Sequence, residues 1–138
     1  IGIDGLIIPD LPIDYYLENY KSIFEQNKLY NMFLIAPQTS DERIRKIDSI
    51  SKGFIYMVSS SSITGSKNSF SSEQINYFER IEKMNLNTPR IIGFGVGNKE
   101  TFNATVNYSK GAIIGSAFIK NLHENGIDSI DSFIKSIR

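Results

Sequence analysis

Short apolar runs alternate with longer segments of helical period along the whole chain. The apolar runs are rich in β-branched residues and lie at 5–8, 30–36, 54–58, 90–94 and 111–114. Between them, apolar residues recur at three- and four-residue spacing, as in helices that cover a sheet with one face. The pattern therefore predicts five strand-helix units, and strands that alternate with helices in this way form parallel sheets.

Apolar stripes and capping residues predict the helices. The expected inward-facing residues are Ile13, Tyr16, Leu17, Tyr20, Ile23 and Phe24 in residues 13–27; Ile44, Ile47 and Ile50 in the second helix; Ile75, Phe78 and Ile81 in the third; and Ile127, Ile130, Phe133, Ile134 and Ile137 in the last. Ser40 and Ser71 or Ser72 have the side chains that cap helix starts. Further helical segments are predicted at 99–108 and 117–122.

No linker or composition shift divides the chain, so residues 1–138 are predicted to belong to one domain. Five units fit a small doubly wound sheet, and they also fit the last five units of an eight-unit barrel. Periodicity alone leaves both open. The chain opens at Ile1, without an initiator Met, in what reads as the entry to a buried strand. From this start we expect the chain to be a piece of a longer protein.

Composition narrows the classes of partner and compartment. Hydrophobic residues make up 41% and charged residues 22% of the 138, enough apolar material for a single core. A net charge of zero gives no basic field for nucleic acid or an anionic membrane. The absence of cysteine excludes disulfides and thiolate metal sites, and no apolar run reaches membrane-spanning length. We therefore expect a cytoplasmic protein.

Glycines at three successive strand ends are the strongest chemical signal. Thr64 and Gly65 follow the third strand, Gly93, Phe94 and Gly95 end the fourth, and Gly115 and Ser116 end the fifth, where a short helix begins at once. In parallel α/β folds ligands bind at these ends, and glycines let backbone N–H groups approach an anion. Each glycine alone is typical of a tight turn. Together they favour a phosphate monoester site.

Other candidate groups are less specific. Asp10 follows the first strand between two prolines, where it either acts in acid–base chemistry or hydrogen-bonds its own loop. Asp41 and Glu42 lie in a first helical turn and complement its dipole. His123 has no ligand set at metal-binding spacing, so no metal is predicted. Tyr56 and Phe94 each present a ring to a flat apolar substrate or fill the core.

Several short motifs, taken in order, carry a family resemblance. They are PDLP at 9–12, APQTSDER at 36–43, ITG at 63–65, GFG at 93–95 and GSA at 115–117. This ordered set closely resembles the tryptophan synthase alpha chain family over essentially the whole chain. The resemblance implies a (β/α)8 TIM barrel, present here as a partial barrel of about five βα units that correspond to units four to eight.

The resemblance also implies an activity. Members of the family are lyases that cleave indole-3-glycerol phosphate to indole and glyceraldehyde 3-phosphate in a retro-aldol step. Indole then passes to a beta chain that contains pyridoxal phosphate, in a heterotetramer of two alpha and two beta chains, and the alpha chain itself holds no cofactor. The family's catalytic Glu and Asp correspond to positions upstream of Ile1, so an isolated 138-residue chain is expected to be inactive.

Residue roles follow from motif position in the family. Gly65, Gly95, Gly115 and Ser116 would hold the phosphate, with Gly93 and Phe94 near the glycerol chain and Ile114 beside the phosphate motif; Ile35 and Tyr56 would line the indole pocket, and Thr64 would hydrogen-bond the catalytic Asp. The segments 9–12 and 59–70 would meet the beta chain. Ser62 departs from the glycine that is common at its position, which bears on loop closure and partner contact.

Two alternatives to this activity stay open at the level of sequence. One is another phosphate-binding barrel enzyme, such as an indole-glycerol-phosphate synthase or a thiamine-phosphate synthase, which shares the late glycines but lacks the ordered PDLP and ITG segments. The other is a non-catalytic half-barrel module that binds a phosphometabolite, which the absence of a paired acid and base favours.

Overall fold

The computed structural model describes residues 2–59 and 69–138, which form alternating strands and helices. The strands are β1 (Gly5–Ile7), β2 (Tyr30–Met32), β3 (Leu34–Ile35), β4 (Ile55–Val58), β5 (Arg90–Gly93) and β6 (Ala112–Ile113). The helices are α1 (Ile13–Tyr15), α2 (Lys21–Gln26), α3 (Asp41–Ile50), α4 (Ser72–Lys83), α5 (Lys99–Val106), α6 (Ser116–Asn125) and α7 (Ile130–Ile137), with a π-helical segment at Tyr16–Tyr20 and a 3-10 turn at Ile127–Ser129. The elements agree closely with the predicted five units.

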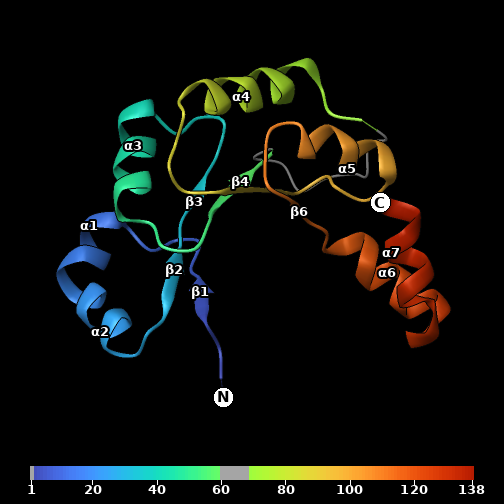
Figure 1. Cartoon of the computed structure of the whole chain (residues 1–138), viewed down its shortest axis with the longest axis horizontal. Coiled ribbons are helices and arrows are strands. Elements are labelled where there is room, and N and C mark those ends of the chain that lie inside the picture. Colours follow the sequence, from blue (N-terminus) through green and yellow to red (C-terminus); the bar gives the residue numbers. More distant parts are fainter. Residues whose placement is uncertain (1, 60–68) are drawn as a thin grey trace.

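Parallel strands follow one another in chain order around an arc (Figure 1). β1 pairs with β2, and β3, β4, β5 and β6 form a four-stranded sheet. The run predicted as one strand over 30–36 is divided at Phe33, whose carbonyl accepts a hydrogen bond of 2.8 Å from the Tyr56 amide. The single predicted strand was therefore wrong in detail, because the chain changes partner from β1 to β4 at this residue.

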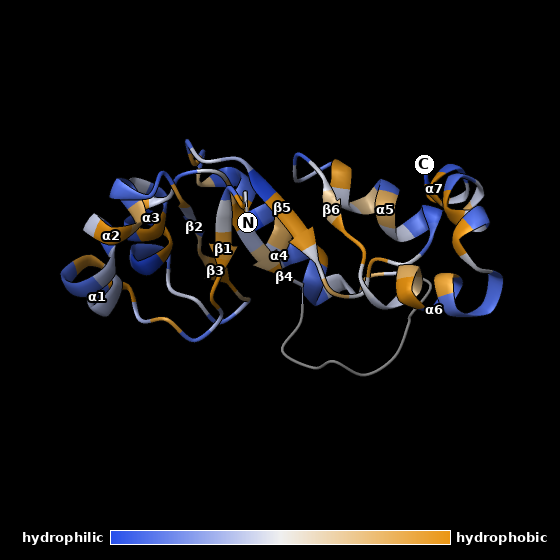
Figure 2. Ribbon diagram, turned by 90° about the horizontal axis from the view of Figure 1, so that it is seen from below, coloured by the Kyte–Doolittle hydropathy of each residue, from blue (hydrophilic) through white to orange (hydrophobic). Residues whose placement is uncertain are grey.

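Helices cover the outer side of the arc, and the core lies between them and the strands (Figure 1). In Figure 2 the apolar colour covers β3 and the part of β5 that follows its hydrophilic first residue. The fully buried side chains that fill this layer come from strands and helices alike: Ile35, Ile55, Met57 and Ile92 from the strands, and Ile44, Ile47, Phe78 and Ile81 from α3 and α4. The predicted stripes of α3 and α4 are thus confirmed. Within the described residues, no helix is long and apolar enough to cross a membrane.

Two predicted stripes hold only in part. In the first helical region Ile13, Tyr16 and Phe24 are buried, but Tyr20 is 38% and Ile23 50% exposed. The π-helical turn has more residues per turn than an α-helix, so it shifts the angular position of the side chains that follow. At the C-terminus Ile137 is buried, whereas Ile127 is 75% and Ile134 46% exposed.

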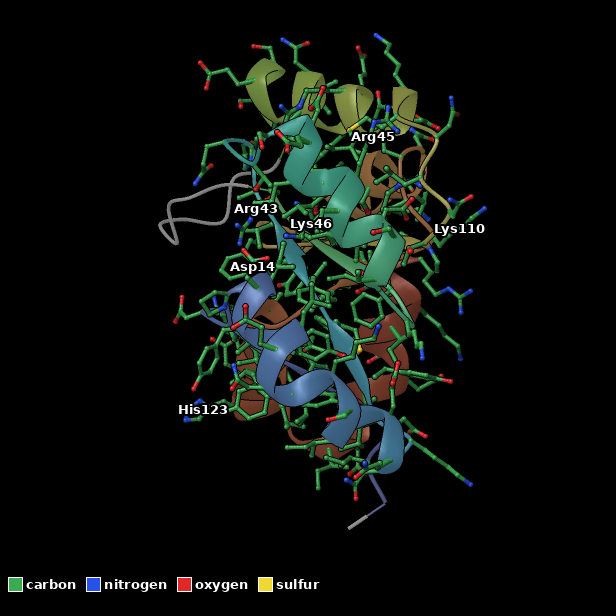
Figure 3. All side chains as sticks on the ribbon, turned by 90° about the vertical axis from the view of Figure 1, so that its left-hand side faces the viewer. Asp14, Arg43, Arg45, Lys46, Lys110 and His123 are labelled. Carbon is green, nitrogen blue, oxygen red and sulfur yellow. The ribbon has the colours of Figure 1, made fainter. Side chains whose placement is uncertain are left out.

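Side-chain contacts fasten neighbouring units to one another. Lys46 on α3 reaches Asp14 on α1 with 2.5 Å between Nζ and Oδ1, and Figure 3 shows the two side chains pointing toward each other. Two residues further along α3, the Asp48 carboxylate accepts hydrogen bonds from the backbone amides of Asn87 (3.0 Å) and Thr88 (2.8 Å). The second contact holds the start of β5 against α3.

Asp48 therefore contributes a pH-dependent part of the folding free energy. Burial raises the pKa of its carboxyl, but hydrogen bonds from Thr88 and Asn87 outweigh it and bring the pKa below the usual 3.8. Since the folded-state pKa is the lower one, this stability is complete above the ordinary pKa and is lost as pH falls through the lowered value.

We predict that Asp48→Asn lowers the free energy of unfolding at pH 7 by about 1 kcal/mol, because the hydrogen bonds lose their charged acceptor. The difference from the unsubstituted chain should shrink as pH falls below the ordinary carboxyl pKa. Urea denaturation across pH values measures both effects. Asp128→Asn, at an exposed position near the C-terminus, is the matched control. Equal destabilisation by the two substitutions would contradict a stabilising role for the contact of Asp48 with Asn87 and Thr88.

Candidate functional site

The carboxyl ends of β4, β5 and β6 lie side by side at one edge of the sheet. Val58 pairs with Gly93, and Gly93 pairs with Ile113, so the strands run in parallel register to their last residues. Ligands of parallel sheets bind at this edge. The segments that hold Gly93 to Gly95 and Gly115 to Ser116, distant in sequence, are therefore neighbours.

Register also determines which side chains share a face of the sheet. Since paired residues of parallel strands point the same way, Leu34, Tyr56 and Ile91 share one face, together with Val58, Gly93 and Ile113. The opposite face carries Ile35, Met57, Ile92 and Ala112, of which the first three are fully buried in the helix-covered core. The face of Tyr56 is the one turned away from the helices.

Two predicted binding residues lie on the helix-covered face. Ile35 is 1% exposed and pairs with Met57, so it fills the core. Ile114 lines an apolar cavity of about 320 Å³ together with Phe102 of α5 and Phe133 and Ile137 of α7. In both cases the residue one position earlier lies on the face of Tyr56 instead. The sequence does not reveal this, because these strands are apolar on both faces and show no alternation of polar and apolar residues.

Leu34 and Ile113 are the residues that sequence reasoning missed. Leu34 pairs with Tyr56, and Ile113 pairs with Gly93. Both therefore lie on the Tyr56 face of the sheet, opposite to Ile35 and Ile114. Counting alternate positions in register with Tyr56 and Gly93 is the signal that identifies them.

Tyr56, Gly93 and Phe94 form the apolar side of the site. A Cβ added at Gly93 would collide with the Tyr56 ring, so the glycine lets that ring lie across β5. The rings of Tyr56 and Phe94 are 6.1 Å apart between centroids and tilted by 34°. Phe94 is 39% exposed, and partial burial raises the pKa of the Tyr56 phenol. The two rings thus lie together at this edge of the sheet, and their role in binding stays a prediction.

The first turn of α6 forms the polar side. Ser40, Ser71 and Asn98 cap α3, α4 and α5 with side-chain oxygens, whereas α6, in the part of the chain that the structure describes, has Gly115 at its N-cap and no side-chain cap. Its first backbone N–H groups therefore keep their capacity to bind an anion. Gly115 and Ser116 are exposed, so a ligand can reach these groups.

The loop after β5 contacts this helix start. A Cβ added at Gly97 would lie 3.3 Å from the Cβ of Ala117, so Gly97 allows the close approach. Gly95, two residues earlier, has a positive φ of 78° that glycine adopts without strain. The two glycine segments thus lie beside each other at one edge of the sheet, next to the aromatic rings of Tyr56 and Phe94.

The remaining predicted residues fall into three groups. Ser62, Thr64 and Gly65 lie outside the described residues. Asp10 lies in an exposed turn between β1 and α1, closed by a 3.4 Å hydrogen bond from Leu11 to Ile8. His123 is exposed on α6, which lies at the opposite end of the arc from α1 and α3 (Figure 1), and no cluster of three potential metal ligands occurs within residues 2–59 and 69–138.

The family profile and the similar curated proteins described below name the same family. The profile described as "Tryptophan synthase alpha chain" matches residues 1–137. The tryptophan synthase alpha chain of Flavobacterium psychrophilum is 66% identical over 136 residues, which are 99% of this chain and 54% of that protein. That of Flavobacterium johnsoniae is 64% identical over 138 residues, 100% of this chain and 54% of the relative. The chain spans about half the length of the curated relatives it matches.

Solved structures agree with the sequence comparison. Tryptophan synthase subunit alpha from Campylobacter jejuni superposes with a TM-score of 0.81 at 28% identity, covering 99% of this chain and 54% of that structure. These findings confirm the resemblance and the expected fold, a partial (β/α)8 barrel.

Gly93→Ala tests the packing of the apolar side of the site. The new methyl group displaces the Tyr56 ring, and we expect the free energy of unfolding to fall by about 1–3 kcal/mol, as in other overpacked interiors. The near-UV circular dichroism of the tyrosines should change with it. Gly111→Ala is the matched control, because a Cβ there meets open space among the described residues. Similar effects of the two substitutions would contradict the packing of the Tyr56 ring against Gly93.

Proposed function

The chain belongs to the tryptophan synthase alpha chain family, and from this premise we propose that it forms the substrate-binding half of a lyase that cleaves indole-3-glycerol phosphate. The products would be indole and glyceraldehyde 3-phosphate. Residues 1–138 would be part of a single TIM-barrel domain. A biosynthetic role of this kind fits the cytoplasmic setting expected from the sequence.

The observation that carries the proposal is the uncapped start of α6 beside the glycines of β5. A phosphate monoester is a dianion, and free N–H groups at a helix N-terminus bind such a group without lysine or arginine. Gly115 and Ser116 would hold the phosphate from α6, and Gly95 would approach it from the loop after β5. Gly65 and Thr64 remain part of the proposed binding set on the basis of the family motif.

The apolar side of the site suits the other end of the substrate. Indole is a flat aromatic ring, and aromatic side chains bind such rings by stacked or edge contacts. Tyr56 and Phe94 would line the indole pocket, with Leu34 in the role first expected for Ile35. Gly93 would leave room for the glycerol chain between the two ends.

The reaction itself needs acid–base groups in addition to this binding surface. Retro-aldol cleavage protonates the indole ring at C3 while protons leave the ring nitrogen and a glycerol hydroxyl, so carboxylates are required on both sides of the substrate. We propose that these carboxylates belong to the part of the family's length that this chain does not span. Residues 1–138 would bind and orient the substrate, and alone would not turn it over.

We further propose a beta chain as the protein partner. The crystal structure of a tryptophan synthase complex from Pyrococcus furiosus is similar to this chain, with a TM-score of 0.75 at 27% identity, covering 99% of this chain and 53% of that one. The turn at 9–12, of which Pro9 and Asp10 are exposed, would contribute to the contact, together with segment 59–70. Pyridoxal phosphate would belong to the partner.

Gly115→Asp tests the phosphate site with opposite effects on stability and binding. The new carboxylate caps α6 and complements its dipole, so it should raise the free energy of unfolding by about 0.5 kcal/mol. It also occupies the anion site, so affinity for glycerol 3-phosphate should fall at least about tenfold. Thermal denaturation and calorimetric titration measure the two effects. Ser40→Asp, at the start of α3, is the control and should leave binding unchanged. If Gly115→Asp also left binding unchanged, that result would contradict a phosphate site at the start of α6.

A chimera tests the activity. When this chain replaces the matching segment of the Flavobacterium psychrophilum alpha chain, to which it is 66% identical, the product should release indole from indole-3-glycerol phosphate, and Gly115→Asp should abolish release. The 138-residue chain alone should release none. A folded but inactive chimera would contradict the proposed function, and turnover by the chain alone would contradict the placement of the acid–base groups.

A further inference from the structure

The turn after β5 contains a residue in an unfavourable backbone conformation. Phe94 has a φ of 65° and is followed by Gly95 at 78°. Glycine adopts positive φ freely, whereas a side chain with a Cβ disfavours it by a margin equivalent to about tenfold in population. The fold must therefore hold Phe94 in place, since such conformations persist only where the surroundings over-determine them.

Ser59 supplies that restraint from the end of β4. Its backbone amide donates a 3.1 Å hydrogen bond to the Gly93 carbonyl, and its hydroxyl donates to the Phe94 carbonyl. These two carbonyls belong to the peptide planes on either side of the Phe94 Cα, and the relative orientation of those planes defines φ and ψ. One residue thus fixes both torsions. Ser59 is fully buried, so water does not compete for either bond.

Ser59 is itself held by the start of α4. Its carbonyl accepts a 3.2 Å hydrogen bond from Nε2 of Gln74, and Oε1 of Gln74 accepts a 2.9 Å bond from the Ser71 amide. Ser71 and Gln74 form a capping box, in which each residue binds the other's backbone. The restraint on Phe94 is therefore anchored in a helix start, which is a rigid part of the fold.

We propose that Ser59 is a positioning residue for the substrate site. By clamping the two peptide planes that flank Phe94, it directs the Phe94 ring toward the site beside Tyr56 and presents the Gly95 amide at the phosphate edge. A right-handed Phe94 would turn its Cα–Cβ bond, and with it the ring, in another direction. The inference rests on the proposed function only for the identity of the ligand.

A ligand-free measurement on the 138-residue chain tests the clamp. A positive φ brings the amide and α protons of a residue close together, so the intra-residue nuclear Overhauser effect of Phe94 is strong. Ser59→Ala should weaken it several-fold. Ser40→Ala, which removes the cap of α3 and touches no part of the Ser59–Gln74–Ser71 chain of contacts, should lower stability and leave the Phe94 signal unchanged. An undiminished signal in Ser59→Ala would overturn the proposal.

A double-substitution cycle tests the link to binding. Ser59→Ala should weaken binding of glycerol 3-phosphate about tenfold, whereas in a Phe94→Gly background, where positive φ is free, it should change affinity less than about twofold. Equal losses in both backgrounds would show a merely structural role. If Ser59→Ala fails to fold, the double variant should fold, because the strain is gone; failure of both would overturn the clamp.

The two proposals fail in different ways. If the unsubstituted chain shows the strong Phe94 signal and Ser59→Ala loses it, but glycerol 3-phosphate does not bind, the clamp stands and the proposed function fails. If the ligand binds and the signal survives Ser59→Ala, the function stands and the clamp fails.

Discussion

The parallel register of β3 to β6 is the constraint on which the rest of the structure depends. It makes Leu34, Tyr56 and Ile91 neighbours on one face and leaves Ile35, Met57 and Ile92 to the helix-covered core. A shift by one residue would exchange these sets and place core side chains in the site. The contact of Asp48 with Asn87 and Thr88 fixes the start of β5, so the same register places Gly93 beside Tyr56 and aligns the strand ends.

At those ends, the start of α6 keeps polar backbone groups free, as the starts of α1, α2 and α7 also do, each without a side-chain cap among the described residues. α3, α4 and α5 begin with capping side chains, and α6 begins with glycine. A sequence selected for stability alone would place a cap at Gly115 as well. The strained Phe94 and its buried partner Ser59 are a second local departure from the rules of stability. Both departures lie at one edge of the sheet, which is where a ligand site is expected.

Much of this was predictable from the sequence. β-branched runs and apolar stripes located all the strand-helix units, and Ser40 and Ser71 marked helix starts correctly. The face assignments of Ile35 and Ile114 were wrong because parallel strands buried on both sides carry no alternating pattern. Tyr20 and Ile23 were misplaced because a π-helical turn has no clear signature in sequence. The role of Ser59 depends on the φ of a residue 35 positions away, which only the fold reveals.

The central claim is that backbone amides at the ends of β5 and β6 form an anion site, and a two-dimensional amide NMR titration of the chain with glycerol 3-phosphate tests it most directly. We expect saturable shifts concentrated at Gly95, Gly115, Ser116 and Ala117, with weaker changes at Tyr56 and Phe94. Shifts confined to exposed lysines and arginines, or no shift at these amides at saturating ligand, would contradict the account.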